Sequence, residues 1–157
     1  MDIYMFLKGL EPDDKGRFIH QIWNFSDNEI ERTHDFIQKL FPLNEPSQYS
    51  LSKYYIDDPK LIEKLRMDPQ IIENIIASMD FMLGFFSRNN QWQYHHNHNQ
   101  LRITRIIKSL LLLVSRNEAK SFYQNILSYI NSDSSIPPIA HDHWRLALDI
   151  KADIETS

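Results

Sequence analysis

A stretch near the middle of the chain concentrates side chains that could do chemistry. Residues 95–110 contain three of the seven histidines and three of the seventeen lysines and arginines. Histidine changes its charge near neutral pH, and arginine presents a planar fork that matches carboxylate and phosphate groups. The stretch therefore indicates a site for an anionic group and leaves the ligand or reaction open.

The spacing of these residues predicts a polar stripe along a mostly apolar helix. At about 100° per residue, His98, Arg102 and Arg105 fall within about 60° of one another. One interpretation is an anion or ligand site near the start of this helix, where backbone N–H groups and the helix dipole also favour negative charge. The other pairs the arginines with acids of a facing helix, such as Glu31 or Asp35, as structural salt bridges.

His34 and Asp35 form a second polar pair, in the middle of a helix predicted over residues 27–41. Adjacent helical positions point about 100° apart, so these two residues do not form a dyad with each other. We interpret His34 as a core histidine on the apolar side of that helix. Asp35 is expected to pair across helices with Arg102 or Arg105.

Trp92 lies shortly before the cationic stretch and has two interpretations. An indole beside cations can stack on a base or a guanidinium, and it can equally fill the core. The candidate ligand-binding residues are His98, Arg102, Arg105, Asp35, Trp92, His34, Asn97 and Asn99. No residue is assigned a catalytic role.

Three neighbouring histidines could suggest zinc, but their spacing argues against it. His95, His96 and His98 do not place two ligands on one helical face, and the chain has no cysteine to assist them. A loop cluster that adds His34 or His141 is the weaker alternative. We expect no metal and no cofactor.

Length and patterning favour one compact all-α domain of six to eight helices. The chain has 157 residues and three glycines, and its apolar residues recur at helical spacing throughout. Two largely apolar helices, over about 69–87 and 99–114, are expected at the centre. We expect a helical domain over 1–131, a linker over 132–138, and a C-terminal segment, 139–157, whose helix is docked by Trp144.

The charge is unevenly distributed along the chain. The net charge is −4, yet residues 88–120 hold six lysines and arginines against one acid. An acidic protein with one basic sector favours a bound anion over a nucleic-acid coat. No apolar run approaches the roughly 20 residues of a membrane span. The absent cysteines and the lack of a signal sequence lead us to expect a cytoplasmic protein.

Two longer segments carry a family resemblance. They are residues 32–46, RTHDFIQKLFPLNEP, and residues 97–110, NHNQLRITRIIKSL, with Met82-Leu83-Gly84-Phe85-Phe86 and Trp92 between them. Together they closely resemble the conserved domain of the opioid growth factor receptor family, over residues 1–131.

The resemblance implies a helical domain and a receptor-type function. Vertebrate members of that family are intracellular, nuclear-associated receptors for methionine enkephalin that restrain cell growth, and bacterial relatives have no assigned activity. This chain differs in having no repeat-bearing tail, no basic localisation cluster, and Lys39 where a tryptophan is usual. The chain therefore looks like a stand-alone version of the domain, and its composition, rich in asparagine and isoleucine, suits a bacterial source.

Three functions remain open at this stage. The favoured one is a module that binds a peptide or small anionic ligand over His98, Arg102, Arg105 and Trp92. An enzyme would use His98 or His34 as general acid and base, Asp35 to orient it and the arginines to stabilise charge, but no nucleophile or phosphate-loop motif supports it. Nucleic-acid binding through residues 88–120 is the weaker third function.

Overall fold

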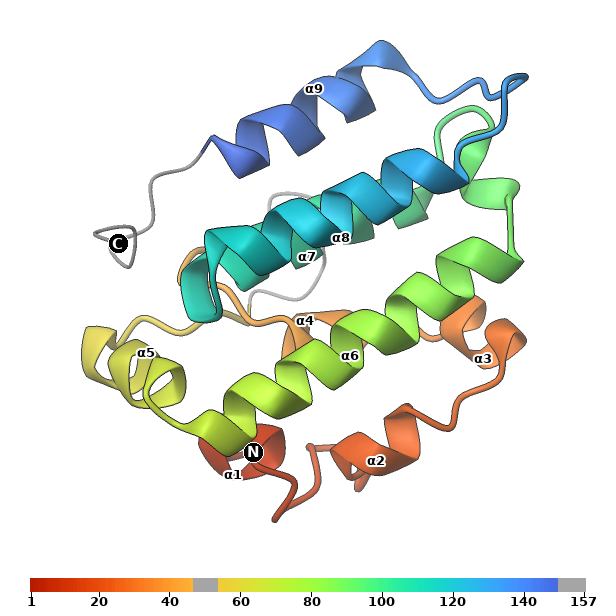
Figure 1. Ribbon diagram of the computed structural model, residues 1–157. Helices are drawn as coiled ribbons and strands as arrows, with labels where there is room; N and C mark the ends of the chain where they lie inside the picture. The colour runs from red at the N-terminus through yellow and green to blue at the C-terminus, as the bar shows by residue number, and fades with distance from the viewer. Residues whose placement is uncertain (47–53, 150–157) are drawn as a thin grey trace. The chain divides into compact units, whose positions relative to one another are not determined.

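The computed structural model of the chain describes residues 1–46 and 54–149 (Figure 1). In these ranges the chain forms nine α-helices and one short 3₁₀ helix, and no β-strand. The all-α class predicted from the sequence is confirmed. The nine α-helices of these ranges exceed the expected six to eight because the helix predicted over residues 27–41 is divided into α3 and α4.

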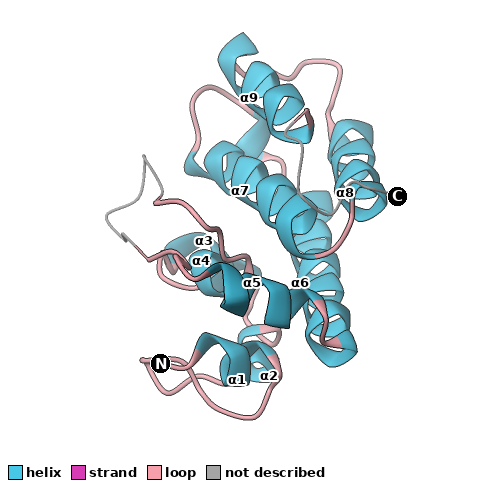
Figure 2. Cartoon of the chain, turned by 90° about the vertical axis from the view of Figure 1, so that its left-hand side faces the viewer, coloured by secondary structure: helices cyan, strands magenta, loops and turns pink. Residues whose placement is uncertain are grey.

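Figure 2 shows these elements as helices joined by loops. They are α1 (Ile3–Leu7), α2 (Ile19–Ile22), α3 (Asp27–Arg32), α4 (Ile37–Leu40), α5 (Pro59–Arg66), α6 (Pro69–Arg88), η1 (Gln91–Gln93), α7 (His98–Leu113), α8 (Arg116–Tyr129) and α9 (Pro138–Leu148).

The chain packs as two compact units, residues 1–81 and residues 82–157. The division falls inside α6, so this helix contributes residues to both units. We refer to them as the N-terminal unit and the C-terminal unit. The predicted organisation into residues 1–131, a linker and a C-terminal segment places its boundary elsewhere and stays a prediction.

Several helices begin where the sequence carries capping signals. Ser26 and Glu29 form a capping box, in which each side chain accepts the backbone N–H of the other. Asp58 and Asp68 precede the prolines that open α5 and α6, and each carboxylate accepts the N–H two residues further on. These predicted helix starts are confirmed.

The helix predicted over residues 27–41 is two helices in the structure. Residues 33–36 separate α3 from α4, and the first of them is extended, with φ −92° and ψ 124°. All six residues from 36 to 41 are buried, whereas one continuous surface helix buries only one side. The break lets this segment turn inward. The prediction that His34 and Asp35 lie in mid-helix is therefore wrong.

α7 is the central helix of the C-terminal unit, as predicted. It contacts both α8 and α9, and ten of its 16 residues are buried. α8 follows α7 directly and begins at a cap, where Ser115 Oγ accepts the N–H of Glu118 at 3.1 Å. α6 is the longest helix, and no helix within the described ranges has the length and apolar character of a membrane span.

Gln93 of η1 holds the connection between α8 and α9. Its buried side chain donates to the carbonyl of Tyr129 at 2.8 Å and accepts the N–H of Asn131 at 2.7 Å. Its own carbonyl accepts the N–H of Ser135 at 3.0 Å. These hydrogen bonds, all within the C-terminal unit, fix residues 131–136 to η1.

Trp144 docks α9 onto α7, as expected. Its indole is fully buried and donates to the carbonyl of Gln100 at 3.0 Å. At the far end of α9, Arg116 donates to the carbonyl of Leu148 at 3.0 Å. α9 ends at Leu148, and residues 150–153 of the predicted helix lie outside the described part of the chain.

Candidate functional site

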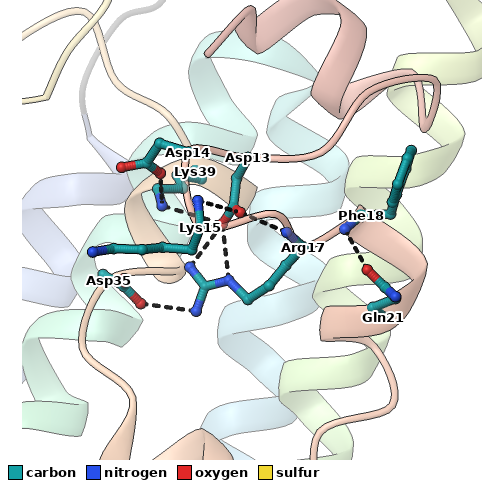
Figure 3. A network of polar contacts seen from close by, with 8 residues as sticks. All are labelled: Asp13, Asp14, Lys15, Arg17, Phe18, Gln21, Asp35 and Lys39. Carbon is teal, nitrogen blue, oxygen red and sulfur yellow. Dashed lines mark hydrogen bonds and ion pairs between the residues drawn. The ribbon is translucent and has the colours of Figure 1, made fainter.

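The N-terminal unit contains a network of charged side chains centred on Asp13 (Figure 3). The Asp13 carboxylate is 0% exposed. Its Oδ2 accepts Arg17 Nε at 2.9 Å, Arg17 Nη2 at 2.7 Å and Lys39 Nζ at 3.2 Å. Its Oδ1 accepts the backbone N–H groups of Lys15 and Arg17, both at 2.9 Å. These donors compensate the cost of burying the charge.

The local sequence folds residues 13–17 into a closed loop around this carboxylate. The N–H of Asp13 donates to the carbonyl of Arg17 at 2.9 Å, and the N–H of Gly16 donates to the carbonyl of Asp13 at 3.0 Å. Gly16 has φ +78°, a conformation that glycine adopts without strain. The loop therefore directs two backbone donors and the Arg17 side chain at one carboxylate.

Two further carboxylates join the network through its cations. Arg17 Nη1 donates to Asp35 Oδ1 at 3.0 Å, and Lys39 Nζ donates to Asp14. Asp35 and Lys39 both belong to the segment 32–46 that carries the family resemblance. The network thus joins that segment to the loop at Asp13.

Burial and hydrogen bonding act in opposite directions on the pKa of Asp13. Burial is the largest single influence and raises the pKa, while hydrogen bonds from Arg17 and Lys39 lower it. The hydrogen bonds together outweigh the effect of burial, and the pKa falls from 3.8 to about 2. The hydrogen bond from Lys39 also lowers the pKa of Asp14. Both carboxylates are charged at neutral pH.

Sequence reasoning did not single out Asp13, Arg17 or Lys39 as a network. One signal was available, because Lys39 stands among Ile37, Leu40 and other residues expected in the core. A lysine in a buried segment needs an acidic partner. Its partners lie about two dozen residues earlier in the chain, and only the fold identifies them.

His34 lies at the surface, so its interpretation as a core histidine is wrong. The break between α3 and α4 turns its side chain to solvent, whereas the residues from Phe36 onward are buried. Asp35 has Arg17 as an ion-pair partner within the same unit. Its predicted pairing with Arg102 or Arg105 stays a prediction.

A second charged cluster in the N-terminal unit surrounds Tyr4. The Tyr4 hydroxyl donates to the Asp68 carboxylate, which also pairs with Lys8 Nζ at 3.0 Å. Lys64 Nζ lies 4.1 Å from the centre of the Tyr4 ring. The hydrogen bonds from Tyr4 and Lys8 lower the pKa of Asp68 to about 2. This cluster ties α1 to the start of α6.

The predicted stripe lies on α7, in the C-terminal unit. His98 is the first residue of the helix and is exposed, and Arg105 is half-buried. Arg102 is 7% exposed, and its Nη1 donates to Asn99 Oδ1 at 3.2 Å. The structure therefore presents His98 and Arg105 more openly than Arg102, whose guanidinium is bonded to Asn99.

Two of the three histidines, His95 and His96, lie on the loop before α7, and hydrogen bonds of the His95 backbone hold this loop. His95 has φ 57°, a left-handed conformation that is uncommon for a residue with a side chain. Its N–H donates to Ser135 Oγ at 2.9 Å, and its carbonyl accepts Gln100 Nε2 at 2.7 Å. Asn97 caps α7 by accepting the N–H of Asn99 at 2.9 Å. Asn97 and Asn99 thus have structural contacts of their own.

Trp92 lies in the core, which agrees with the second of its two interpretations. Its ring is fully buried and packs edge-on against Phe86. Its Nε1 donates to the carbonyls of Phe86 at 3.1 Å and Asn89 at 2.8 Å. The buried indole closes the end of α6 and offers no face to a ligand. Stacking of Trp92 on a surface-bound ligand is therefore not supported.

The described residues contain no group of three histidine, aspartate or glutamate side chains that could hold a metal ion. His141 instead packs edge-on against Trp144, with 5.1 Å between ring centres. Burial is the main cause that lowers the pKa of His141 from 6.5.

A match to a known family decides to which family the chain belongs. Residues 3–91 match the opioid growth factor receptor (OGFr) conserved region, which is more than half of the chain. The chain belongs to the opioid growth factor receptor family. The match contains the first family segment, at residues 32–46, and stops before the second.

Curated relatives support the same family assignment. The rat opioid growth factor receptor is 33% identical over 110 residues, which covers 59% of this chain and 19% of the relative. The human receptor is 33% identical over 116 residues, covering 60% of this chain and 17% of the relative. The mouse opioid growth factor receptor-like protein 1 is 29% identical over 149 residues, covering 82% of this chain and 31% of the relative.

A match that covers 82% of 157 residues necessarily includes the second segment, at residues 97–110. The chain spans between about a sixth and a third of the length of these relatives. No solved structure matches the chain significantly.

Proposed function

We propose that the chain is a ligand-binding domain of the receptor type, and that its C-terminal unit binds an acidic peptide at the exposed start of α7. His98 and Arg105 are the proposed contact residues. Arg102, held by Asn99, supplies a further positive charge on the same stripe. The named relatives are receptors, and we extend to this chain the class of function that their name states.

The distribution of charge carries this proposal. α7 has three cationic side chains and no acidic one. Residues 82–157 hold eight lysines and arginines against six acids, whereas residues 1–81 hold nine against fifteen. The net positive charge of the C-terminal unit therefore attracts an anionic ligand, and the net negative charge of the N-terminal unit repels it.

Residue roles within the stripe follow from burial. Trp92, Asn97 and Asn99 support α7 from within, so we leave them out of the proposed contact surface. Asp35 is engaged by Arg17, and neither it nor His34 is part of the proposed contact surface. The proposed contact surface therefore has fewer residues than the eight predicted from the sequence. It consists of His98 and Arg105, together with the more buried Arg102 on the same stripe.

Calorimetric titration tests the proposal with two peptides that differ in charge alone. One peptide carries glutamates around a tyrosine, and the other carries glutamines at the same positions. We expect binding of the glutamate peptide and a dissociation constant about tenfold higher for Arg105→Ala or His98→Ala, which corresponds to about 1.4 kcal/mol for each. Binding should weaken as salt rises, because these groups are near the surface.

Lys120→Ala is the matched control, since it removes one exposed cation from α8 in the same unit. This variant should bind the glutamate peptide as tightly as the parent chain. Equal binding of both peptides, or equal loss in Lys120→Ala and Arg105→Ala, would contradict the proposed contact residues. Tighter binding of a single-stranded RNA with a steep salt dependence would favour a nucleic-acid interface instead.

A further inference from the structure

The outer face of α9 carries two exposed apolar side chains. Ile139 is 55% exposed and Leu146 is 63% exposed, while Ala140, Trp144 and Ala147 on the inner face are buried. Residues seven apart lie on the same side of a helix, two turns from each other. Ile139 and Leu146 therefore form one short apolar stripe, which we call the α9 stripe.

One edge of the α9 stripe is charged. Asp142 and Arg145 form an ion pair, and their side chains are more than half exposed. At about 100° per residue, both lie on the same edge of the stripe, about 60° and about 120° from Ile139. The face thus offers an apolar row beside one acid and one base.

We propose that the α9 stripe binds the same face of a second copy of the chain, with the two α9 helices antiparallel about a two-fold axis. The axis passes between Asp142 and His143, midway along the stripe. Ile139 then packs against the partner's Leu146, and Leu146 packs against the partner's Ile139. A two-fold interface uses one patch twice, so the patch must complement itself.

The charged edge meets this requirement. A two-fold axis perpendicular to both helices keeps the charged edges of the two copies on the same side. Asp142 then lies within about two residues, or about 3 Å along the helix, of the position opposite the partner's Arg145. Each copy supplies one acid and one base, so two symmetric ion pairs form across the axis.

The size of this surface indicates a weak dimer. α9 has 11 residues and is therefore about 16 Å long, which is short for an interface that usually buries about 800 Å² per partner. We expect a dissociation constant on the order of 10⁻⁴ M.

Sedimentation equilibrium of the full chain, from about 10 µM to about 1 mM, spans that dissociation constant. The average mass should rise toward that of a dimer with concentration. Leu146→Glu places a charge in the stripe and should keep the chain monomeric throughout. Met67→Glu is the control, because Met67 is an exposed apolar residue (72%) that lies in the N-terminal unit. It should dimerise like the parent chain.

A charge exchange tests the arrangement of the two helices. Asp142→Arg should raise the dissociation constant about tenfold or more, because it brings like charges together. The double variant Asp142→Arg with Arg145→Asp should restore dimerisation, since each ion pair re-forms with its signs exchanged. A monomer at every concentration, or a dimer that Leu146→Glu leaves intact, would overturn the proposal. Failure of the exchange to restore a dimer would overturn the antiparallel arrangement.

Discussion

At the scale of single residues, Asp13 is the centre of a polar network that no sequence motif indicated. Its two oxygens accept hydrogen bonds from Arg17, Lys39 and two backbone N–H groups, and its carboxylate has no contact with solvent. Removing the acid would leave Arg17 with Asp35 and Lys39 with Asp14, two carboxylates that are more exposed than Asp13. The energetic consequence should therefore exceed that of losing a surface ion pair.

Asp13→Asn should lower the free energy of unfolding by about 2–4 kcal/mol, because it removes the buried carboxylate that both cations share. Asp14→Asn is the matched control, since Asp14 also pairs with Lys39 but its side chain is 56% exposed. We expect it to cost less than about 1 kcal/mol. Urea unfolding followed by circular dichroism measures both. Equal costs would mean that Asp13 is not the centre of the network.

The depressed pKa values of Asp13 and Asp68 predict how stability depends on pH. Each folded pKa is about 2, below the ordinary value of 3.8. A carboxylate with a lower pKa in the folded state stabilises the fold above its unfolded pKa and loses this effect as pH falls toward the folded pKa. The urea midpoint should therefore fall between about pH 4 and about pH 2.

The variants Asp13→Asn and Asp68→Asn assign this acid sensitivity to residues. Each should start from lower stability at neutral pH and show a smaller fall between about pH 4 and about pH 2, because one linked proton is gone. If both variants lost stability in acid as steeply as the parent chain, other carboxylates would be responsible.

At the scale of elements, the described helices show what local patterns predict and where they stop. The predicted helices over about 69–87 and 99–114 correspond to α6 and α7, and the capping residues before α3, α5 and α6 act as expected. These features depend on residues close together in sequence. The break between α3 and α4 does not depend on nearby residues alone, because it allows the whole segment after it to be buried.

The polar contacts of the candidate sites were less predictable for the same reason. Lys39 and Asp13 are 26 residues apart, and their pairing depends on how the loop at Asp13 meets α4. The pattern on α7 did identify the polar stripe. It did not show that Arg102 would be buried, because burial depends on the elements packed around α7.

The loop before α7 offers a prediction about backbone strain. His95 adopts φ 57°, which disfavours residues with branched side chains and suits glycine. His95→Gly should change the free energy of unfolding by less than about 1 kcal/mol, whereas His95→Val should lower it by about 1–2 kcal/mol. Thermal unfolding of the two variants at equal concentration measures the difference.

A second substitution separates strain from loss of the imidazole. His95→Asn removes the imidazole but tolerates the left-handed conformation. It should resemble His95→Gly and not His95→Val. If Asn and Val were equally destabilising, the imidazole and not the backbone would be the important group.

At the scale of the whole molecule, Trp144 is the largest side chain that joins α9 to the rest of the C-terminal unit. Trp144 fills the contact with α7 and donates to the carbonyl of Gln100, while Gln93 holds the preceding connection. The C-terminal segment is therefore expected to contribute to the stability of α7 and α8, and so to the surface at His98.

Trp144→Ala should lower the free energy of unfolding by about 3–5 kcal/mol, since it empties a large buried volume. Trp144→Phe keeps most of the packing but loses the donor to Gln100, and about 1–2 kcal/mol is expected. Urea unfolding measures both costs. Limited proteolysis should show earlier cleavage between α8 and α9 in Trp144→Ala. Unchanged stability and cleavage in that variant would mean that α9 folds independently of α7.

The continuity of α6 has a consequence for where the chain can be divided into fragments. A chain break in the middle of α6 would leave backbone groups at both new ends without their helical hydrogen bonds. The division between the two units is therefore a poor place to end a fragment. The region shared with the family agrees with this constraint. It runs from residue 3 to residue 91 and includes the whole of α6, passing the division without a stop. Fragments for expression should therefore keep α6 whole.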